Sequence, residues 1–285
     1  MKNILQKIVL FYGNVVPYHR GKWRVVERLL SAAGGVPEGL CRARRRGVEW
    51  ELNLAGLIER SLYYLGVYEV HESAYIESQV QPDWVICDIG ANFGYYAHIL
   101  SAATKGQARV HAFEPSSALY AALVRNHALN PGFERLHTWK LALSDRVGQV
   151  ALERAPEMNL GLGRLQLEGG TGEAFEQVET VTLDQFARDQ QLERVDFMKI
   201  DVEGAEALVL SGAEETIRRF RPQMMIEINP EALEAFGTRA EVLLSRIREL
   251  GYTLHCLEGR RLVPLNGLSE EDDYVNAICL PKPRA

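Results

Sequence analysis

An α/β fold with one mostly parallel sheet is the architecture that the sequence predicts, for two reasons. From residue 84 onward, short apolar runs alternate with longer segments of helical character, which is the pattern of βαβ units joined by right-handed crossovers. The last three apolar runs, at residues 252–257, 261–265 and 275–280, follow one another without a helix. These runs predict an antiparallel edge on the parallel sheet.

Each strand and helix of this pattern has a local signal. Trp84 to Cys87 is a continuous apolar run, as expected of a strand that is buried on both faces. Ser116 and Thr182 are of the residue types that cap helix N-termini, and each precedes an expected helix. Further strands are expected at residues 109–113, 136–143, 195–200 and 224–228, and helices at residues 95–103, 116–129, 183–190, 205–220 and 239–250.

The first 80 residues are predicted to form a helical N-terminal extension, or lid, that precedes a domain of residues 81–285. Its expected helices, at residues 23–32 and 58–64, are separated by the break at residues 34–37, which reads Gly-Gly-Val-Pro. The role of residues 1–55 is not predicted.

The N-terminal region is also basic. Residues 1–50 contain ten Lys or Arg and three Glu, a net charge of +7, whereas the rest of the chain carries −13. A solvated polar face explains such a run. The functional alternative is a platform that attracts an anionic acceptor or makes peripheral contact with an anionic membrane surface. Nucleic acid is not an expected partner, because the acidic remainder of the chain repels phosphates.

The composition is that of an ordinary soluble globular protein, with 47% hydrophobic and 25% charged residues. Four dispersed cysteines without a C-x-x-C pair argue against a zinc site or a disulfide framework and fit a reducing compartment. No apolar run approaches the roughly 20 residues that span a bilayer, and no signal-peptide cleavage site follows the N-terminus. We therefore expect a cytoplasmic protein without a transmembrane segment.

A glycine loop follows the first strand of the α/β domain and reads Asp-Ile-Gly-Ala-Asn-Phe-Gly at residues 88–94. Gly90 and Gly94 would let the backbone approach a ligand, and Asn92 is a residue type that tolerates positive φ. The loop lies between the carboxyl end of a strand and the amino end of a helix, where open α/β sheets bind ligands. Ordinary turn glycines are the alternative interpretation.

The residues around this loop favour a cationic nucleoside over a dinucleotide. The loop lacks the G-x-G-x-x-G spacing, and the Asp88 carboxylate would repel a phosphate group. A carboxylate at this place suits the ammonium and sulfonium groups of S-adenosylmethionine. Glu114 ends the next strand, before Pro115, and is expected to accept hydrogen bonds from ribose hydroxyls. A helix-capping acid is the alternative for Glu114.

Three segments together resemble the FkbM family of methyltransferases: residues 88–96, 112–115 and 199–206. Weaker family-like pieces extend the similarity over roughly residues 60–230. The resemblance implies a class I methyltransferase (Rossmann-like) fold, with a seven-stranded, mostly parallel sheet that ends in an antiparallel hairpin. It also implies that residues 81–285 bind S-adenosylmethionine. Members of this family methylate oxygens on carbohydrates and polyketide-type products.

Methyl transfer from a sulfonium to a hydroxyl requires alignment of the reacting atoms and removal of the hydroxyl proton. Asp201 follows the strand at residues 195–200 and is the expected general base, with Lys199 on the same face. Glu203 is a second catalytic candidate, or a charge at a helix N-terminus. Lys199 could also be a buried counter-ion. A magnesium site of Asp201, Glu203 and Glu227 is a minority alternative, so no metal is assigned.

The remaining binding residues are assigned by their place and by the resemblance. The long connection at residues 155–180 is expected to recognise the acceptor, with Asn159 and Arg164 as candidates, while Glu227 would orient the acceptor hydroxyl. The candidate cofactor contacts are Glu69, Asp88, Gly90, Ala91, Asn92, Gly94, Tyr95, Glu114, Pro115, Ser116, Leu143 and Asp201.

The function predicted from these residues is O-methylation of a sugar, a glycan or a related small metabolite. A nicotinamide-dependent oxidoreductase and a cofactor-binding module without turnover are the alternatives. The identity of the acceptor, a metal requirement and the oligomeric state are not predicted.

Overall fold

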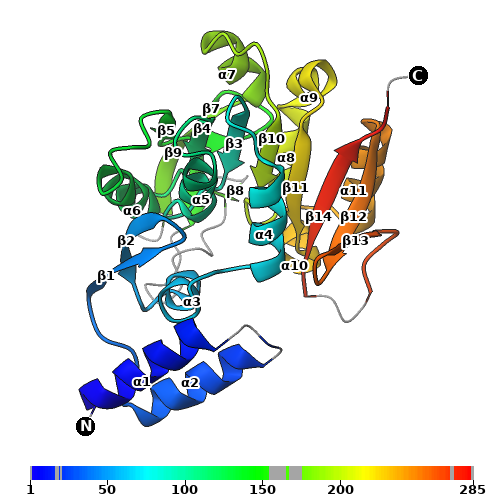
Figure 1. The fold of residues 1–285 in the computed structure, drawn as a ribbon. Helices are drawn as coiled ribbons and strands as arrows, with labels where there is room; N and C mark the ends of the chain where they lie inside the picture. Colours follow the sequence, from blue (N-terminus) through cyan, green and yellow to red (C-terminus); the bar gives the residue numbers. More distant parts are fainter. Residues whose placement is uncertain are drawn as a thin grey trace.

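The computed structural model describes residues 2–16, 19, 21–153, 165–166, 175–269 and 273–283. Its centre is a sheet with the strand order β13-β12-β14-β11-β10-β3-β4-β5 (Figure 1). The five strands from β11 to β5 pair in parallel, and β12, β13 and β14 pair in antiparallel fashion. The predicted mixed sheet is therefore confirmed, with eight strands where seven were expected, because β13 adds an outer strand.

The strands of the central sheet lie close to the predicted positions. They are β3 (Val85–Ile89), β4 (Arg109–Phe113), β5 (Leu136–Trp139), β10 (Phe197–Ile200), β11 (Gln223–Ile228), β12 (Tyr252–Glu258), β13 (Arg261–Pro264) and β14 (Val275–Pro281). All five residues of β3 are buried, as its apolar run predicts. The side chains of β3 alternate between two hydrophobic clusters, one on each face of the sheet.

The helices that follow these strands differ from the prediction at two places. The helix expected at residues 205–220 is divided at Gly212, where the chain turns. The backbone there lies so close to Ser144 that a Cβ at Gly212 would be 1.9 Å from the Ser144 carbonyl oxygen. A helix after β11 was not predicted, although Asn229 caps it and Pro230 begins it. The helices are α5 (Tyr95–Ala103), α6 (Ser117–Ala128), α7 (Leu183–Asp189), α8 (Glu206–Ser211), α9 (Glu214–Phe220), α10 (Pro230–Ala235) and α11 (Ala240–Glu249).

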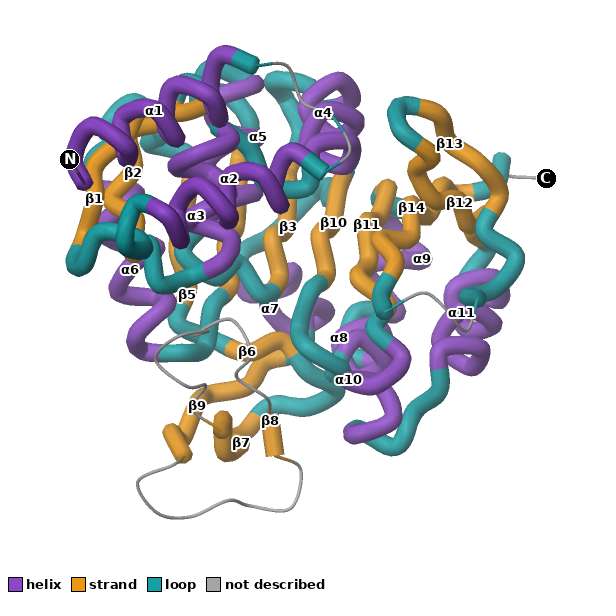
Figure 2. The backbone as a smooth tube through the Cα atoms, turned by 90° about the horizontal axis from the view of Figure 1, so that it is seen from below, coloured by secondary structure: helices purple, strands orange, loops and turns teal. Residues whose placement is uncertain are grey.

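A second sheet lies below the central one in Figure 2 and has the order β6-β9-β7-β8. The strand expected at residues 136–143 divides between the two sheets, and part of the connection expected at residues 155–180 is a strand. The four strands are β6 (Ala142–Leu143), β7 (Gly148–Glu153), β8 (Leu165–Gln166) and β9 (Phe175–Val181). Asn159 and Arg164, the acceptor-binding candidates, lie outside the described residues.

The N-terminal extension contains a β-hairpin in addition to helices. Its elements are α1 (Lys2–Val15), α2 (Lys22–Ala32), β1 (Leu40–Arg45), β2 (Val48–Asn53), α3 (Leu57–Leu65) and α4 (Val70–Gln79). Arg46 and Gly47, both with positive φ, form the two-residue hairpin turn, a signal that the sequence analysis missed. Trp50 of β2 is fully buried and packs against Phe93 and Tyr95, so the extension shares a core with the sheet.

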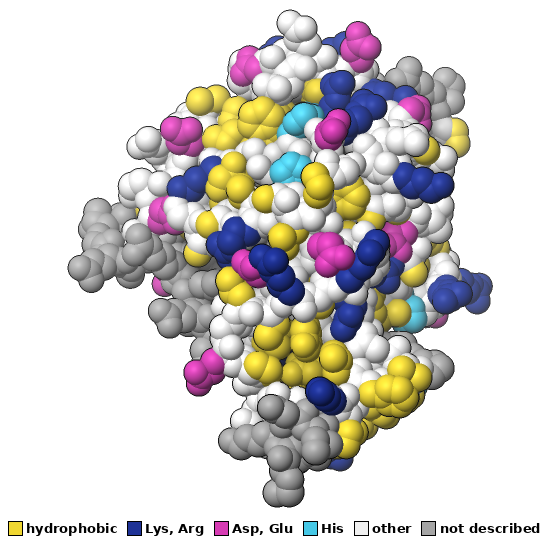
Figure 3. Space-filling model, turned by 60° about the vertical axis from the view of Figure 1, so that its left-hand side comes forward, with side chains coloured by type: hydrophobic (Ala, Val, Ile, Leu, Met, Phe, Trp, Pro, Cys, Tyr) yellow, Lys and Arg dark blue, Asp and Glu magenta, His cyan; other side chains and the backbone are white. Residues whose placement is uncertain are grey.

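The basic cluster of residues 42–46 is paired with acidic and carbonyl groups. Arg42 and Arg44 of β1 face acidic residues of β2, with N–O distances of 3.3 and 3.6 Å. Arg45 donates to a carbonyl group and Arg46 pairs with Glu77. Figure 3 shows this side of the molecule, where basic and acidic side chains are interspersed. This pairing favours a solvated polar face, rather than a platform for an anionic partner, as the interpretation of residues 42–46. Among the described helices, none could cross a bilayer.

Candidate active site

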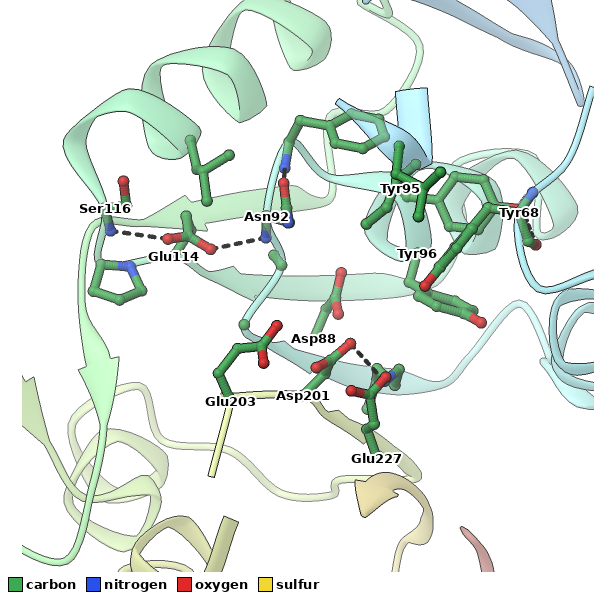
Figure 4. A pocket seen from close by; sticks show the side chains of 18 of the residues that line it. Tyr68, Asp88, Asn92, Tyr95, Tyr96, Glu114, Ser116, Asp201, Glu203 and Glu227 are labelled. Carbon is green, nitrogen blue, oxygen red and sulfur yellow. Dashed lines mark hydrogen bonds and ion pairs between the residues drawn. The ribbon is translucent and has the colours of Figure 1, made fainter. Parts of the chain in front are cut away.

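A cavity of about 220 Å³ opens at the carboxyl ends of β3, β4, β10 and β11 (Figure 4), and Leu57 and Ile58 of α3 also line it. Five carboxyl groups and one ammonium group line it among the described residues. The loop after β3 forms one side, and the residues that follow β10 form the opposite side. The polar lining residues are Tyr68, Asp88, Asn92, Tyr95, Tyr96, Glu114, Ser116, Lys199, Asp201, Glu203 and Glu227.

The two loop glycines are required by the protein's own packing. Gly90 has a φ of 81°, and a Cβ there would lie 1.8 Å from the backbone oxygen of Asp201. Gly94 has a φ of 94°, and its Cβ would meet Leu123 of α6 at 2.5 Å. We expected these glycines to admit a ligand. The structure shows that they let the loop pack against the end of β10 and against α6, and Gly90 also lines the cavity.

Glu114 joins the glycine loop to the end of β4. Its Oε2 accepts a hydrogen bond of 2.9 Å from the Asn92 backbone N–H, and its Oε1 accepts one of 2.8 Å from the Ser116 N–H. Asn92 has the positive φ that its residue type allows, 56°. Ser116 occupies the N-cap position of α6, but its side chain makes no capping bond. Each Glu114 oxygen retains a lone pair that can accept a ligand hydroxyl.

Asp88 lies at the bottom of the cavity and is 1% exposed. Its Oδ2 accepts a hydrogen bond of 2.8 Å from the Ala97 N–H in α5, so one oxygen is already used by the fold. Burial raises the pKa of Asp88 to about 7, against the opposing charge of Lys199. Burial likewise raises the pKa of Glu114 to about 7. A cation bound beside these groups would favour their ionised forms.

The predicted pair of Lys199 and Asp201 is formed at the end of β10. Lys199 Nζ lies 3.1 Å from Asp201 Oδ2 and 5.6 Å from the centroid of the Tyr96 ring. Burial opposes the charge of Lys199, but Asp201, Glu69 and Glu227 raise its pKa above the ordinary value. Lys199 is therefore a protonated counter-ion. The side chain of Asp201 is 31% exposed and reaches the cavity.

Glu227 of β11 and Glu203 complete the acidic side of the cavity. Burial and then the charge of Asp201 raise the pKa of Glu227 to about 9, so Glu227 is protonated at neutral pH and can donate a hydrogen bond. Glu203 has a φ of 52°, which is uncommon for a non-glycine residue. Glu206 is the first residue of α8, and its Oε1 accepts hydrogen bonds from the Val202 and Gly204 N–H groups of the preceding turn.

Three of the predicted cofactor residues do not line the cavity. Gly94, the last residue of the loop, packs against α6, and Leu143 lines a smaller cavity of about 40 Å³ that shares Gly90, Pro115 and Leu152 with the first. Glu69 accepts a hydrogen bond from the Tyr96 hydroxyl and contacts the lining from behind. The other nine predicted cofactor residues are brought together: Asp88, Gly90, Ala91, Asn92, Tyr95, Glu114, Pro115, Ser116 and Asp201.

Sequence reasoning missed several lining residues that come from distant segments. Tyr68, Leu57 and Ile58 come from the N-terminal extension, and Leu152 comes from the second sheet. The backbone of Tyr68 pairs with the Tyr95 hydroxyl, at 3.1 Å for its N–H and 2.9 Å for its carbonyl. No local pattern marked the others. Within the described ranges, no group of three or more His, Cys, Asp or Glu could hold a metal ion.

The strand order and the acidic cavity at the ends of β3 and β4 are those of a class I methyltransferase fold. Residues 88–254 match the model of the methyltransferase FkbM domain. The chain therefore belongs to the FkbM family and is a methyltransferase. The resemblance that the sequence analysis drew from three segments is confirmed.

Named relatives are similar over part of the chain. Methyltransferase sdnD of Sordaria araneosa is 30% identical over 185 residues, which are 55% of this chain and 70% of that protein. Hexuronic acid methyltransferase AglP of Haloferax volcanii is 28% identical over 134 residues, 47% of this chain and 52% of that protein. The 2-O-methyltransferase NoeI of Sinorhizobium fredii is 30% identical over 154 residues, 50% of this chain and 62% of that protein.

A solved structure, that of methyltransferase FkbM from Methylobacillus flagellatus, superposes with a TM-score of 0.47 and 14% sequence identity. The alignment covers 98% of this chain and 58% of that chain.

Proposed function

We propose that this methyltransferase uses S-adenosylmethionine to methylate a hydroxyl group of a sugar, glycan or related small molecule. The observation that carries the proposal is the acidic lining of the cavity: among the described residues, five carboxyl groups and one ammonium group face this space. Such a lining attracts a cation and repels a pyrophosphate. S-adenosylmethionine carries an ammonium and a sulfonium, whereas a nicotinamide dinucleotide carries two phosphates.

The residues present fit this cofactor. Glu114 would hold the ribose hydroxyls with the lone pairs that its bonds to Asn92 and Ser116 leave free. Asp88 and Asp201 would offset the cofactor's positive groups. When bound, S-adenosylmethionine supplies an electrophilic methyl group on sulfur.

The acceptor hydroxyl must lose its proton, and the two acids beside the cavity differ in their ability to take it. Glu227 is already protonated at neutral pH, because burial and Asp201 raise its pKa to about 9. Asp201 is paired with the Lys199 ammonium and is the carboxylate that can accept a proton. We assign Asp201 as the general base and Glu227 as a hydrogen-bond donor that orients the acceptor.

The name of one relative supports a carbohydrate acceptor, and the name of another supports transfer to an oxygen atom. AglP is named a hexuronic acid methyltransferase and NoeI a 2-O-methyltransferase. Residues 81–285 would bind the cofactor and residues 1–80 would cover the acceptor side. A cytoplasmic location and peripheral membrane contact through the basic N-terminal region remain predictions, as does the absence of a nucleic-acid partner.

The test is methyl transfer from labelled S-adenosylmethionine to a panel of hydroxylated acceptors. Asp201→Asn should still bind the cofactor, with only the loss of affinity that follows from one missing nearby charge, and at saturating cofactor should lose on the order of 10²- to 10⁴-fold in turnover, the usual range for general-base assistance. Asp189→Asn, on the exposed end of α7, is the matched control and should behave as wild type. Normal turnover by Asp201→Asn would remove this residue as the base.

Two other outcomes would reassign the function. Thermal stabilisation by NAD but not by S-adenosylmethionine would favour the oxidoreductase alternative. Cofactor binding without transfer to any acceptor would favour a binding module.

A further inference from the structure

A second cavity, of about 990 Å³, adjoins the candidate active site. The N-terminal extension forms one wall, through α3 and the start of α4, and β12, β13 and the residues before β14 form the other. Leu57 and Tyr68 line both cavities, so the two spaces meet at these side chains. The larger cavity is thus placed to admit a molecule whose reacting end reaches Asp201 and Glu227. We call it the acceptor cleft.

The end of the cleft nearest the active site is polar and includes an unsatisfied acceptor atom. Asn276 is 6% exposed and donates a hydrogen bond of 2.6 Å from Nδ2 to Glu69 Oε1. Its Oδ1 is buried and has no hydrogen-bond donor among the described residues. Buried polar atoms are almost always paired, so this oxygen indicates a donor that the ligand supplies. Glu69 and Tyr274 line the same end and can also bond hydroxyl groups.

The far end of the cleft is apolar. Leu65 of α3 lines one wall, and Leu257 of β12, Val263 of the outermost strand β13 and Leu265 line the other. Val263 is only half buried, so apolar surface remains open to solvent. A ligand that covers such surface gains about 25 cal/mol for each Å² removed from water.

The charge of the cleft selects against anions. Glu69, Glu72 and Glu258 line it, and none of the described lining residues is Lys or Arg. The basic residues 42–46 pair elsewhere and contribute no lining group. A phosphate or carboxylate in the cleft would meet three glutamates without a compensating Lys or Arg among the described lining residues, which is unfavourable.

We propose that the acceptor is a neutral glycoside: a hydroxyl-bearing sugar ring at the Asn276 end, joined to an apolar aglycone at the Val263 end. This inference rests on the proposed function and narrows it. It excludes nucleotide-linked sugars, uronic acids and free sugars as preferred acceptors.

Calorimetric titration tests the cleft without depending on turnover. Octyl glucoside, kept below its micelle concentration, should bind at least about tenfold more tightly than glucose, octyl glucuronide or a uridine diphosphate sugar. Val263→Arg, which places a cation in the apolar end, should weaken octyl glucoside binding on the order of tenfold. Val242→Arg on the exposed side of α11 is the matched control and should leave binding unchanged.

Each outcome has a distinct meaning. Tighter binding of the nucleotide sugar, of the glucuronide or of free glucose would overturn the inference, as would octyl glucoside binding that Val263→Arg leaves intact. These results would leave the proposed function standing if S-adenosylmethionine still binds. Failure of S-adenosylmethionine to bind the wild-type protein would instead overturn the proposed function.

Discussion

Asn276 of β14 donates a hydrogen bond of 2.6 Å to Glu69, which precedes α4, across a separation of 207 residues in the chain. Glu69 also accepts from the Tyr96 hydroxyl of α5. This pair of contacts links the last strand, the N-terminal extension and the helix after the glycine loop. The wall between the cofactor cavity and the acceptor cleft depends on it.

Replacement of Asn276 should loosen this wall. Asn276→Leu removes a hydrogen bond to an acidic group and leaves Glu69 with one partner fewer, so we expect the free energy of unfolding to fall by about 2 kcal/mol. Urea denaturation measures this change. Asn266→Leu, at an exposed position of the same cleft, should change stability by less than about 0.5 kcal/mol. Equal effects of the two variants would argue against a structural role for the Asn276–Glu69 bond.

Gly90→Ala should destabilise the fold far more than alanine at another glycine that also has a positive φ but has open space around it. A Cβ at Gly90 would lie 1.8 Å from the Asp201 oxygen, whereas Gly237, with φ of 71°, has nothing within 4 Å. Gly237→Ala should lower the free energy of unfolding only by the strain of a left-handed backbone, about 1–2 kcal/mol. Gly90→Ala must also displace the end of β10. Thermal unfolding compares the two, and a Gly90→Ala loss no larger than that of Gly237→Ala contradicts the packing described here.

Glu114→Ala should weaken S-adenosylmethionine binding at least about tenfold, because the variant lacks the carboxylate proposed to hold the ribose and frees the backbone N–H groups of Asn92 and Ser116. Glu114→Gln keeps an acceptor oxygen and should lose less affinity. Equilibrium dialysis with labelled cofactor measures both. Glu179→Ala, at an exposed position on β9, is the control for loss of one acidic charge. An unchanged affinity in Glu114→Ala would place the ribose elsewhere.

The stability of the protein without cofactor should fall as pH rises from about 6.5 to about 9. Burial raises the pKa of Glu227 to about 9 and those of Asp88, Glu114 and Glu206 to about 7, so the folded chain binds protons that the unfolded chain has released. The stabilisation from each group is fully present below its ordinary pKa in the unfolded chain. It is lost as the pH rises to the pKa of that group in the folded chain.

Buried histidines act in the opposite direction at lower pH. Burial lowers the pKa of His98 to about 4, so its contribution to stability grows as pH rises toward 6.5 and is constant above it. The decline above pH 6.5 therefore belongs to the carboxyl groups. Glu227→Gln should reduce the slope between pH 7 and 9 in a series of urea titrations. A slope that the substitution leaves unchanged would contradict the raised pKa of Glu227.

The sequence predicts the sheet and the centre of the site because both depend on local signals. Asp88, Glu114 and Asp201 lie at the carboxyl ends of three parallel strands, β3, β4 and β10, and such strand ends meet at one edge of a sheet, so their proximity follows from their place after apolar strand runs. The lining by Tyr68 and Leu152 arises from packing between distant segments, which no local pattern encodes. The role of Gly90 also depends on packing, since only the position of the Asp201 carbonyl shows what a side chain would strike.

A crystal structure of the protein soaked with S-adenosylmethionine tests the proposed cofactor site most directly. We expect adenosine in the cavity at the ends of β3 and β4, with its ribose hydroxyls on Glu114 and its sulfonium facing Asp201. A cavity that stays vacant at saturating cofactor, or one that holds a pyrophosphate group instead, would contradict the proposed site.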